Sequence, residues 1–134
     1  MLLPHNCYVA LVDGETFDVY RNAGAEAEPQ LVLLDPPVLD SSNHSGGSHR
    51  SSHGNHADRL VAEDAHARAA ANWLNREVIR DRIKHLVIIA PPRTLGEMRK
   101  HYHRKLREVV RKEVAKELVA FNPHDFMHVL REPD

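Results

Sequence analysis

The sequence predicts an α/β protein in which one mixed β-sheet carries helices on its faces. Two runs of β-forming residues surround Asp13-Gly14, a dipeptide typical of the turn in an antiparallel hairpin. Further along, the apolar run Leu86–Ala90 lies between two stretches of helical periodicity, as a strand does when both of its faces are covered. The chain has 134 residues, of which 42% are hydrophobic, so we expect residues 1–134 to form a single domain.

The first third of the chain is expected to supply three strands. Cys7–Asp13 is apolar and rich in β-forming residues, and Thr16–Arg21 alternates between the two faces of a strand. Gln30–Asp35 is the third run, and Pro36-Pro37 ends it because proline has no backbone donor for a sheet. Residues 40–56 are rich in His, Ser and Gly and show no periodicity, so they are predicted to form a flexible loop within the domain.

The second half of the chain alternates helices with strands. A helix is expected from about Asp58 to about Arg80, because apolar residues between Val61 and Val78 recur at helical spacing. The strand Leu86–Ala90 follows. The next predicted helix has an apolar stripe formed by Leu95, Met98, Tyr102, Leu106 and Val109.

Residues 110–119 are ambiguous between helix and strand. Val110, Val114 and Leu118 recur every four residues, which favours a helix, although the same residues can also be placed in a strand. Asn122-Pro123 is a good helix start, with a capping residue followed by proline in the first turn. A short final helix is therefore predicted over the segment PHDFMHVL.

Charge is unevenly distributed along the chain, although its net charge is only −1 with neutral histidines. Residues 93–116 contain nine basic and three acidic residues, a net charge of +6, which leaves −7 on the remainder. Such a segment suits an anionic partner, and a solvated charged surface is the alternative. Aromatic residues make up only 5% of the chain, which argues against stacking on the bases of a single strand.

Residues that could carry catalysis or bind a metal show no convincing pattern. The single cysteine, Cys7, lies in an apolar run and is expected in the core, with no disulfide within the chain. Four of the eleven histidines lie in residues 40–56 without the fixed spacing that a zinc site needs. Asp13 ends a strand where a nuclease could place a metal-binding carboxylate, but a turn residue is the simpler interpretation. We expect no catalytic residue, no metal and no cofactor.

Membrane insertion and export are not expected from the sequence. No apolar segment approaches the roughly 20 residues that a membrane-spanning helix needs. The first residues lack the basic start and the cleavage site of a signal peptide, so a cytoplasmic location is expected. The oligomeric state is left open.

The segment HLVIIAPPRTLGEMRK places a rigid basic corner directly after a buried strand. Pro91-Pro92 withholds two backbone donors, and Thr94 is expected to cap the helix that follows. An open helix N-terminus beside Arg93 would suit a phosphate or carboxylate. Alternatively, Arg93 pairs with a nearby Asp and the prolines only end the strand. The candidate anion- or RNA-binding residues are Arg93, Thr94, Arg99, Lys100, Arg104, Lys105 and Arg107.

Two segments resemble the bacterial host-attachment protein family. The first is LPHNCYVALVDGETFDVYRN, and the second is LVIIAPPRTLGEMRKHYH. The residues of its Ala-Pro-Pro-Arg-x-Leu-Gly-x-x-Arg motif are Ala90, Pro91, Pro92, Arg93, Leu95, Gly96 and Arg99. That family is similar to the middle domain of archaeo-eukaryotic class-1 release factors. The resemblance implies a ribonuclease-H-like sheet of five strands in the order β-β-β-α-β-α-β-α, and it places a strand near Val109–Leu118 where spacing alone favours a helix.

The same resemblance gives the long loop a functional context. Release factors carry Gly-Gly-Gln in the corresponding loop, whereas here Gly46-Gly47 is followed by Ser48, so the catalytic amide is missing. The glycine pair also fits ordinary linker composition. We therefore expect a non-catalytic interaction protein that binds an anionic partner, RNA or the ribosome, through the basic helix and the Pro-Pro-Arg corner. A hydrolase or nuclease acting on RNA or tRNA esters is the alternative.

Overall fold

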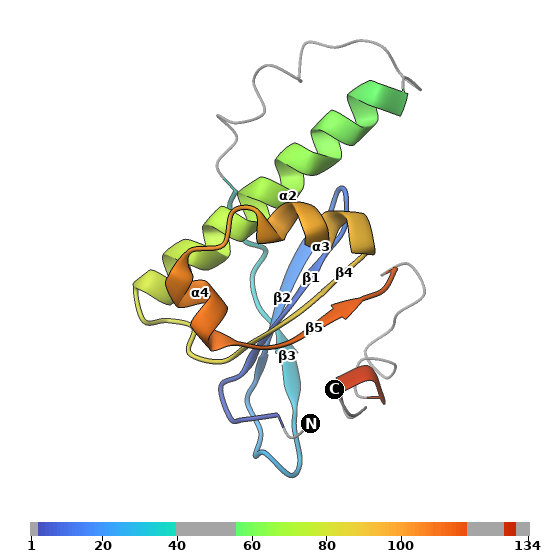
Figure 1. Cartoon of the computed structure of the whole chain (residues 1–134). Helices are drawn as coiled ribbons and strands as arrows, with labels where there is room; N and C mark the ends of the chain where they lie inside the picture. Colours follow the sequence, from blue (N-terminus) through green and yellow to red (C-terminus); the bar gives the residue numbers. More distant parts are fainter. Residues whose placement is uncertain (1–2, 40–55, 118–127, 131–134) are drawn as a thin grey trace.

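Five strands form one mixed sheet in the order β3-β2-β1-β4-β5 in the computed structural model of the chain (Figure 1). The described residues are 3–39, 56–117 and 128–130. β1 (Tyr8–Val12) pairs antiparallel with β2 (Phe17–Asn22), which pairs antiparallel with β3 (Leu31–Leu33). β1 also pairs parallel with β4 (Leu86–Ala90), and β4 pairs parallel with β5 (Val110–Ala115). The predicted α/β class with a mixed five-stranded sheet is confirmed.

Three helices lie on one face of this sheet (Figure 1). They are α2 (His56–Ile79), α3 (Pro92–Arg99) and α4 (Arg104–Val109). Within the described residues, none of the helices is long and apolar enough to cross a lipid bilayer. The long helix α2 was expected from the spacing of its apolar residues, and it begins two residues earlier than Asp58.

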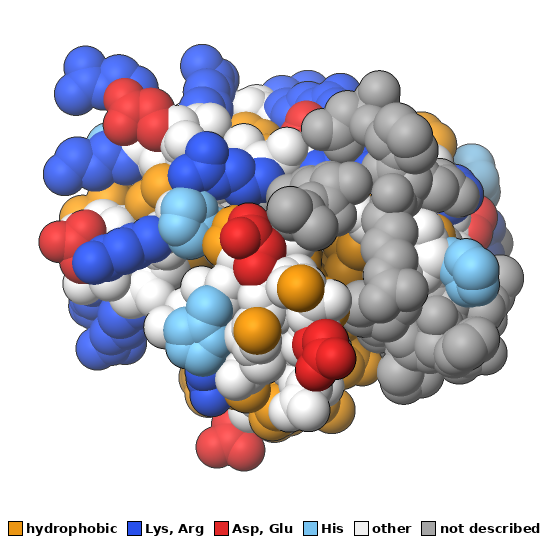
Figure 2. Space-filling view, turned by 90° about the horizontal axis from the view of Figure 1, so that it is seen from below, with side chains coloured by type: hydrophobic (Ala, Val, Ile, Leu, Met, Phe, Trp, Pro, Cys, Tyr) orange, Lys and Arg blue, Asp and Glu red, His pale blue; other side chains and the backbone are white. Residues whose placement is uncertain are grey.

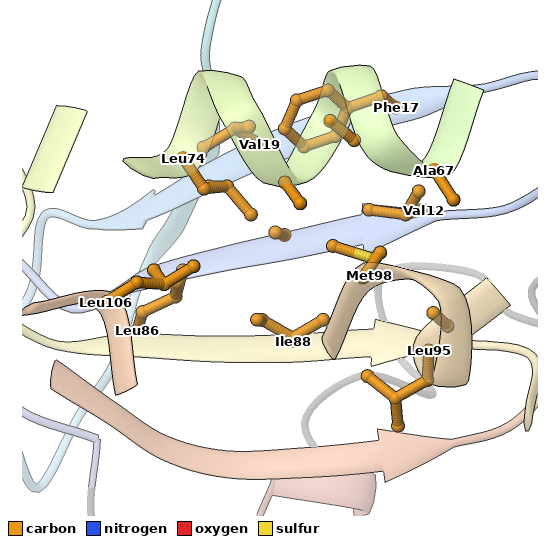
Figure 3. Close-up of a cluster of buried hydrophobic side chains, with 14 of the residues drawn as sticks. Val12, Phe17, Val19, Ala67, Leu74, Leu86, Ile88, Leu95, Met98 and Leu106 are labelled. Carbon is orange, nitrogen blue, oxygen red and sulfur yellow. The ribbon is translucent and has the colours of Figure 1, made fainter. Parts of the chain in front are cut away.

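The core between the sheet and these helices is built from alternate strand residues. Val12, Val19 and Ile88 point to this side and meet the side chains of α2, which is lined by small residues such as Ala67 (Figure 3). Leu95 and Met98 of α3 and Leu106 of α4 complete the same cluster. Since α2 presents alanines to the sheet, the helix can approach closely and leave few gaps.

The opposite face of the sheet has its own smaller core. Val9, Leu11, Val87 and Ile89 point to this side, as the alternation of a strand requires. Cys7 is fully buried here, and burial raises the pKa of its thiol to about 11, which confirms its prediction as a core residue. The other buried residues of this cluster are Leu3, Val114, Val129 and Leu130. Of the predicted final helix, only residues 128–130 are described, and these are helical.

The single helix predicted to carry Leu95 to Val109 is wrong, because the structure divides it into α3 and α4. Asn75 of α2 donates from Nδ2 to the carbonyl of His101 at 2.8 Å and accepts from the backbone N–H of His103 at 2.9 Å. The imidazole of His103 then caps α4 by accepting from the backbone N–H of Lys105 at 3.0 Å. A side chain from another helix therefore fixes the break.

The helical interpretation of residues 110–119 is also wrong, and the strand implied by the family resemblance is confirmed. β5 pairs with β4 from Leu86↔Val110 to Ala90↔Ala115, with one irregularity at the start. Hydrogen bonds to β4 satisfy backbone donors and acceptors of this segment. Its β-branched valines are also favoured in a strand.

Candidate nucleic-acid interface

The Pro-Pro-Arg corner lies at the carboxyl end of the sheet, where β1 and β4 end. α3 begins at Pro92, and no side chain among the described residues caps it. Thr94 lies inside the first turn and is buried, so the prediction that Thr94 caps the helix is wrong. Pro92 suits the first position since its missing donor has no partner there in any helix. Arg93 donates from Nη2 to Oδ2 of Asp64 at 2.9 Å, which is the alternative pairing considered from the sequence.

The surroundings of Arg93 are acidic. A cavity of about 370 Å³ at this corner is lined by Arg93 together with four carboxylates: Asp13, Glu15, Glu63 and Glu117. With Asp64 also paired to the guanidinium, the local field repels anions. Anion binding at this corner stays a prediction, and the charges of the cavity argue against it.

Asp13 serves as the turn residue of the β1–β2 hairpin. Its Oδ1 accepts from the backbone N–H groups of Glu15 and Thr16 at 2.9 and 2.6 Å and from the Thr16 hydroxyl at 2.8 Å. Burial raises the pKa of Asp13, but these hydrogen bonds and the nearby His66 outweigh burial and lower it overall. Within the described ranges, no cluster of His, Cys, Asp and Glu could hold a metal ion.

Two of the predicted basic residues are occupied by ion pairs. Arg99 donates from Nε and Nη2 to Oε1 of Glu113 at 3.1 and 2.9 Å. Lys100 pairs with Glu97 at 3.0 Å. These cations are therefore largely neutralised by their own neighbours.

The remaining three cations, Arg104, Lys105 and Arg107, are exposed on α4. Leu106 is fully buried and anchors the inner side of the short helix, which turns these three side chains outward. In the part of the chain that the structure describes, none of the three has an ion-pair partner. Among the predicted binding residues, α4 thus carries the cations that are available to a ligand.

Two contacts fix the segment that leads into α4. Asn75 holds the turn before it, and the Tyr102 hydroxyl donates to Oε2 of Glu113 on β5 at 2.8 Å. Burial, together with this hydrogen bond to Glu113, raises the pKa of Tyr102, so its phenol stays neutral. A cavity of about 360 Å³ beside this contact is lined by Arg99, Tyr102, Arg107, Val110 and Glu113. The exposed cations are therefore carried by a rigid support.

Further cations that the sequence did not single out lie at the amino end of the sheet, where β1 and β4 begin. Arg21 of β2 is the partner of Tyr8, and Tyr8 is the partner of Leu86. This pairing brings Arg21 to the turn that contains Arg82 and Lys84, and the three residues line one cavity. Figure 2 looks onto this end and shows Lys and Arg side chains gathering on the side of α4 and of the C-terminal end of α2. Only the strand order could have revealed this grouping.

The predicted loop residues Gly46, Gly47 and Ser48 lie outside the described residues, so their place relative to Arg93 stays untested. The loop was predicted to extend to residue 56, but His56 already belongs to α2.

Residues 6–130 match the model of a family described as bacterial archaeo-eukaryotic release factor family 12. The chain belongs to this family. Its membership confirms the relationship to release factors that the sequence motifs implied, and it connects the chain with translation. No curated protein matches the sequence. The family's description does not mention attachment to host cells, so that part of the resemblance stays a prediction.

Proposed function

We propose that this member of the release factor family binds RNA, alone or in the ribosome, through the exposed cations of α4, and that it does so without catalysis. The observation that carries the proposal is the contrast in pairing within the predicted set. Arg104, Lys105 and Arg107 are exposed without a carboxylate partner among the described residues, whereas the other cations are paired. Available cations on a rigid surface are the usual footprint of contacts with phosphates.

A non-catalytic role is supported by the contacts of Asp13 and Arg93, the residues that could take part in a reaction. Oδ1 of Asp13 is engaged in its own turn, and Arg93 is paired with Asp64. The alternative, hydrolysis of RNA or tRNA esters, is supported by the family relationship, but Ser48 replaces the glutamine of release factors. RNA binding would place the protein in the cytoplasm, and we propose that any effect on host attachment is an indirect consequence.

The test compares two triple variants with the same change in charge. Arg104→Gln, Lys105→Gln and Arg107→Gln remove the exposed cations, whereas Arg93→Gln, Arg99→Gln and Lys100→Gln remove the paired ones. Fluorescence anisotropy with labelled tRNA and a ribosomal RNA fragment is measured over a range of salt concentrations. We expect the α4 variant to lose at least about tenfold in affinity, and its salt slope to fall by about 2, since each lost phosphate contact contributes about 0.7 to 0.9.

The paired-cation variant is expected to lose much less affinity, because those charges are already neutralised. Equal losses in the two variants would show that binding follows total charge and would contradict the α4 site. Binding that does not depend on ionic strength would contradict phosphate recognition altogether.

A further inference from the structure

A basic cavity of about 440 Å³ lies at the amino end of the sheet, outside the α4 surface. Its volume is in the range of small-molecule sites. The backbone N–H of Tyr8 donates to the carbonyl of His85 at 2.8 Å, which joins the start of β1 to the turn before β4. The charged residues and histidines that line the cavity are Arg21, Arg82, Lys84, His5, His85 and Asp81.

The positive charge of this cavity is only weakly neutralised. Lys84 is exposed and has no carboxylate partner within the described residues. Arg21 donates from Nη1 to Oδ1 of Asn6 at 2.9 Å, which is a neutral acceptor. Arg82 reaches Glu77 at 3.3 Å, but its side chain remains 60% exposed. The cavity therefore attracts anions, in contrast to the acidic cavity at the carboxyl end of the sheet.

His85 adds a donor whose orientation is fixed. Arg111 of β5 directs Nε and Nη2 at Nδ1 of His85, at 3.0 and 2.8 Å. Because a guanidinium can only donate, Nδ1 must be the acceptor and the ring hydrogen must lie on Nε2. The imidazole thus offers one N–H to a ligand, with the charge of Arg111 directly behind it.

Two residues that line the cavity have left-handed backbone. Asn6 has a φ of 65° and Asp81 a φ of 61°, and they are the two non-glycine residues with positive φ in the described part of the chain. Both line this cavity. Asp81 ends α2 in this conformation, because its N–H and that of Arg82 donate to the carbonyls of Val78 and Glu77 at 3.0 and 2.9 Å, which fixes the turn that carries Lys84.

We propose that this cavity binds the phosphomonoester group of a nucleotide, either free or at the end of an RNA strand. A terminal phosphate carries nearly two charges at neutral pH and presents three oxygens to donors on several sides. Arg21 comes from β2, whereas the adjacent residues Lys84 and His85 come from the turn before β4, so donors from two segments can meet such a group. A phosphate inside a chain carries only one charge and has only two unesterified oxygens, so it uses such a set of donors less fully. The inference goes beyond RNA binding by α4 and does not depend on it.

The first experiment is an NMR titration of the full chain, following backbone amides at constant ionic strength. Inorganic phosphate and uridine 5′-monophosphate are expected to shift the amides of residues 5–8 and 81–85, whereas uridine leaves them unchanged. Lys84→Gln is expected to weaken binding of the monophosphate about fivefold, because it removes one full charge from the site. Asp81→Asn is expected to strengthen binding by a similar factor, since asparagine tolerates the same backbone and removes the carboxylate.

Lys116→Gln is the matched control, because it removes an exposed cation that lies after β5, at the carboxyl end of the sheet. We expect it to leave the affinity unchanged. The proposal is overturned if uridine shifts the same amides, if no ligand shifts them at millimolar concentration, or if Lys84→Gln and Lys116→Gln have equal effects.

The source of the phosphate is identified with RNA oligonucleotides that carry either a 5′-phosphate or a 5′-hydroxyl. If the 5′-phosphorylated strand shifts residues 5–8 and 81–85 and the 5′-hydroxyl strand does not, the cavity accepts an RNA end. If the monophosphate shifts these residues and neither strand does, the cavity accepts a free nucleotide. Failure of the α4 proposal is visible separately, as the absence of shifts at residues 104–109 with the 5′-hydroxyl strand.

Discussion

The two ends of the sheet are both rich in ionisable residues, yet they differ in the charge that they offer to a ligand. At the carboxyl end, Arg93 is paired with Asp64 and shares its cavity with four carboxylates. At the amino end, Lys84 lacks a carboxylate partner in the described ranges, and Asp81 is the single carboxylate that lines the cavity. A basic motif in the sequence therefore locates a charged residue, but the fold decides whether neighbouring carboxylates neutralise that charge.

The difference follows from the chain topology. The long helix α2 runs over the carboxyl end near its start and places Glu63 and Asp64 beside the Pro-Pro-Arg corner. The turn after α2 reaches the amino end and carries Arg82 and Lys84. α2 thus brings acidic residues to one end of the sheet, and the turn that follows it brings basic residues to the other end.

The largest expected effect concerns Asn22, which holds the amino end together. Asn22 is fully buried, and its Nδ2 donates to the carbonyls of Leu3 and Pro4 at 3.0 and 3.1 Å. Its Oδ1 accepts from the backbone N–H groups of Gly24 and Gln30, both at 2.9 Å. Asn22→Ala leaves these groups without partners and is expected to lower the free energy of unfolding by about 3 kcal/mol, measured by urea unfolding.

The reactivity of Cys7 shows whether Asn22→Ala loosens the amino end of the sheet. Asn22 donates its backbone N–H to the carbonyl of Cys7 at 2.8 Å, and the buried thiol has a pKa of about 11. Wild-type Cys7 should react slowly with a thiol reagent at neutral pH, and Asn22→Ala should react much faster. Gln30→Ala is the control, since it keeps the backbone N–H that Gln30 donates to Asn22. Equal labelling of all three proteins would contradict a local role for Asn22.

A smaller effect is expected at Asn75, which shapes the turn before α4. Asn75→Ala frees the carbonyl of His101 and the N–H of His103, and water can reach the exposed His103. We expect a loss of about 1 to 2 kcal/mol in the free energy of unfolding. RNA affinity should fall about threefold although no cation is removed, because the α4 cations lose their fixed support. Asn72→Ala, one turn earlier on α2, is the control.

If Asn75→Ala lost stability and bound RNA with unchanged affinity, the rigid placement of α4 would be irrelevant to binding. The contrast between the two ends of the sheet would then rest on charge alone.

Much of the fold could be predicted because its signals are local. The Asp13-Gly14 turn, the apolar strand Leu86–Ala90 and the periodicity of α2 each lie within a short stretch of sequence. β5 could not be assigned this way, since valines spaced by four fit both structures until β4 is available as a partner. The division between α3 and α4 depends on Asn75, which lies 26 residues from His101.

The candidate site was less predictable because its chemistry depends on pairs. Arg93 and Asp64 are 29 residues apart, and Arg99 and Glu113 are 14 apart, so the sequence could identify the cations but not their neutralisation. The basic segment did indicate α4 correctly as part of a charged surface. Lys84 was missed because its short basic turn with Arg82 meets Arg21 of β2 only through the sheet.

The smallest expected effect tests the carboxyl end through the pH dependence of Asp13. Burial raises its pKa, but hydrogen bonds from Glu15 and Thr16 and the nearby His66 lower the pKa overall. A lowered pKa means that the ionised form stabilises the fold above the ordinary aspartate pKa of about 4, and that this contribution is lost as the pH falls through the folded value. Because Asp13 is only partly buried and solvent screens its charge, the contribution should be only about 0.5 kcal/mol.

Asp13→Asn keeps the Oδ1 acceptor and removes the charge, so it isolates this contribution. The free energy of unfolding of wild type should exceed that of the variant at neutral pH, and the difference should shrink when the measurement is repeated at about pH 3. The opposite sign is informative as well. If acidification stabilised wild type relative to Asp13→Asn, repulsion from Glu15 and Glu63 would outweigh the hydrogen bonds of the turn. The carboxyl end would then be strained by its own negative charge, which would make it even less suited to an anion than its ion pairs already indicate.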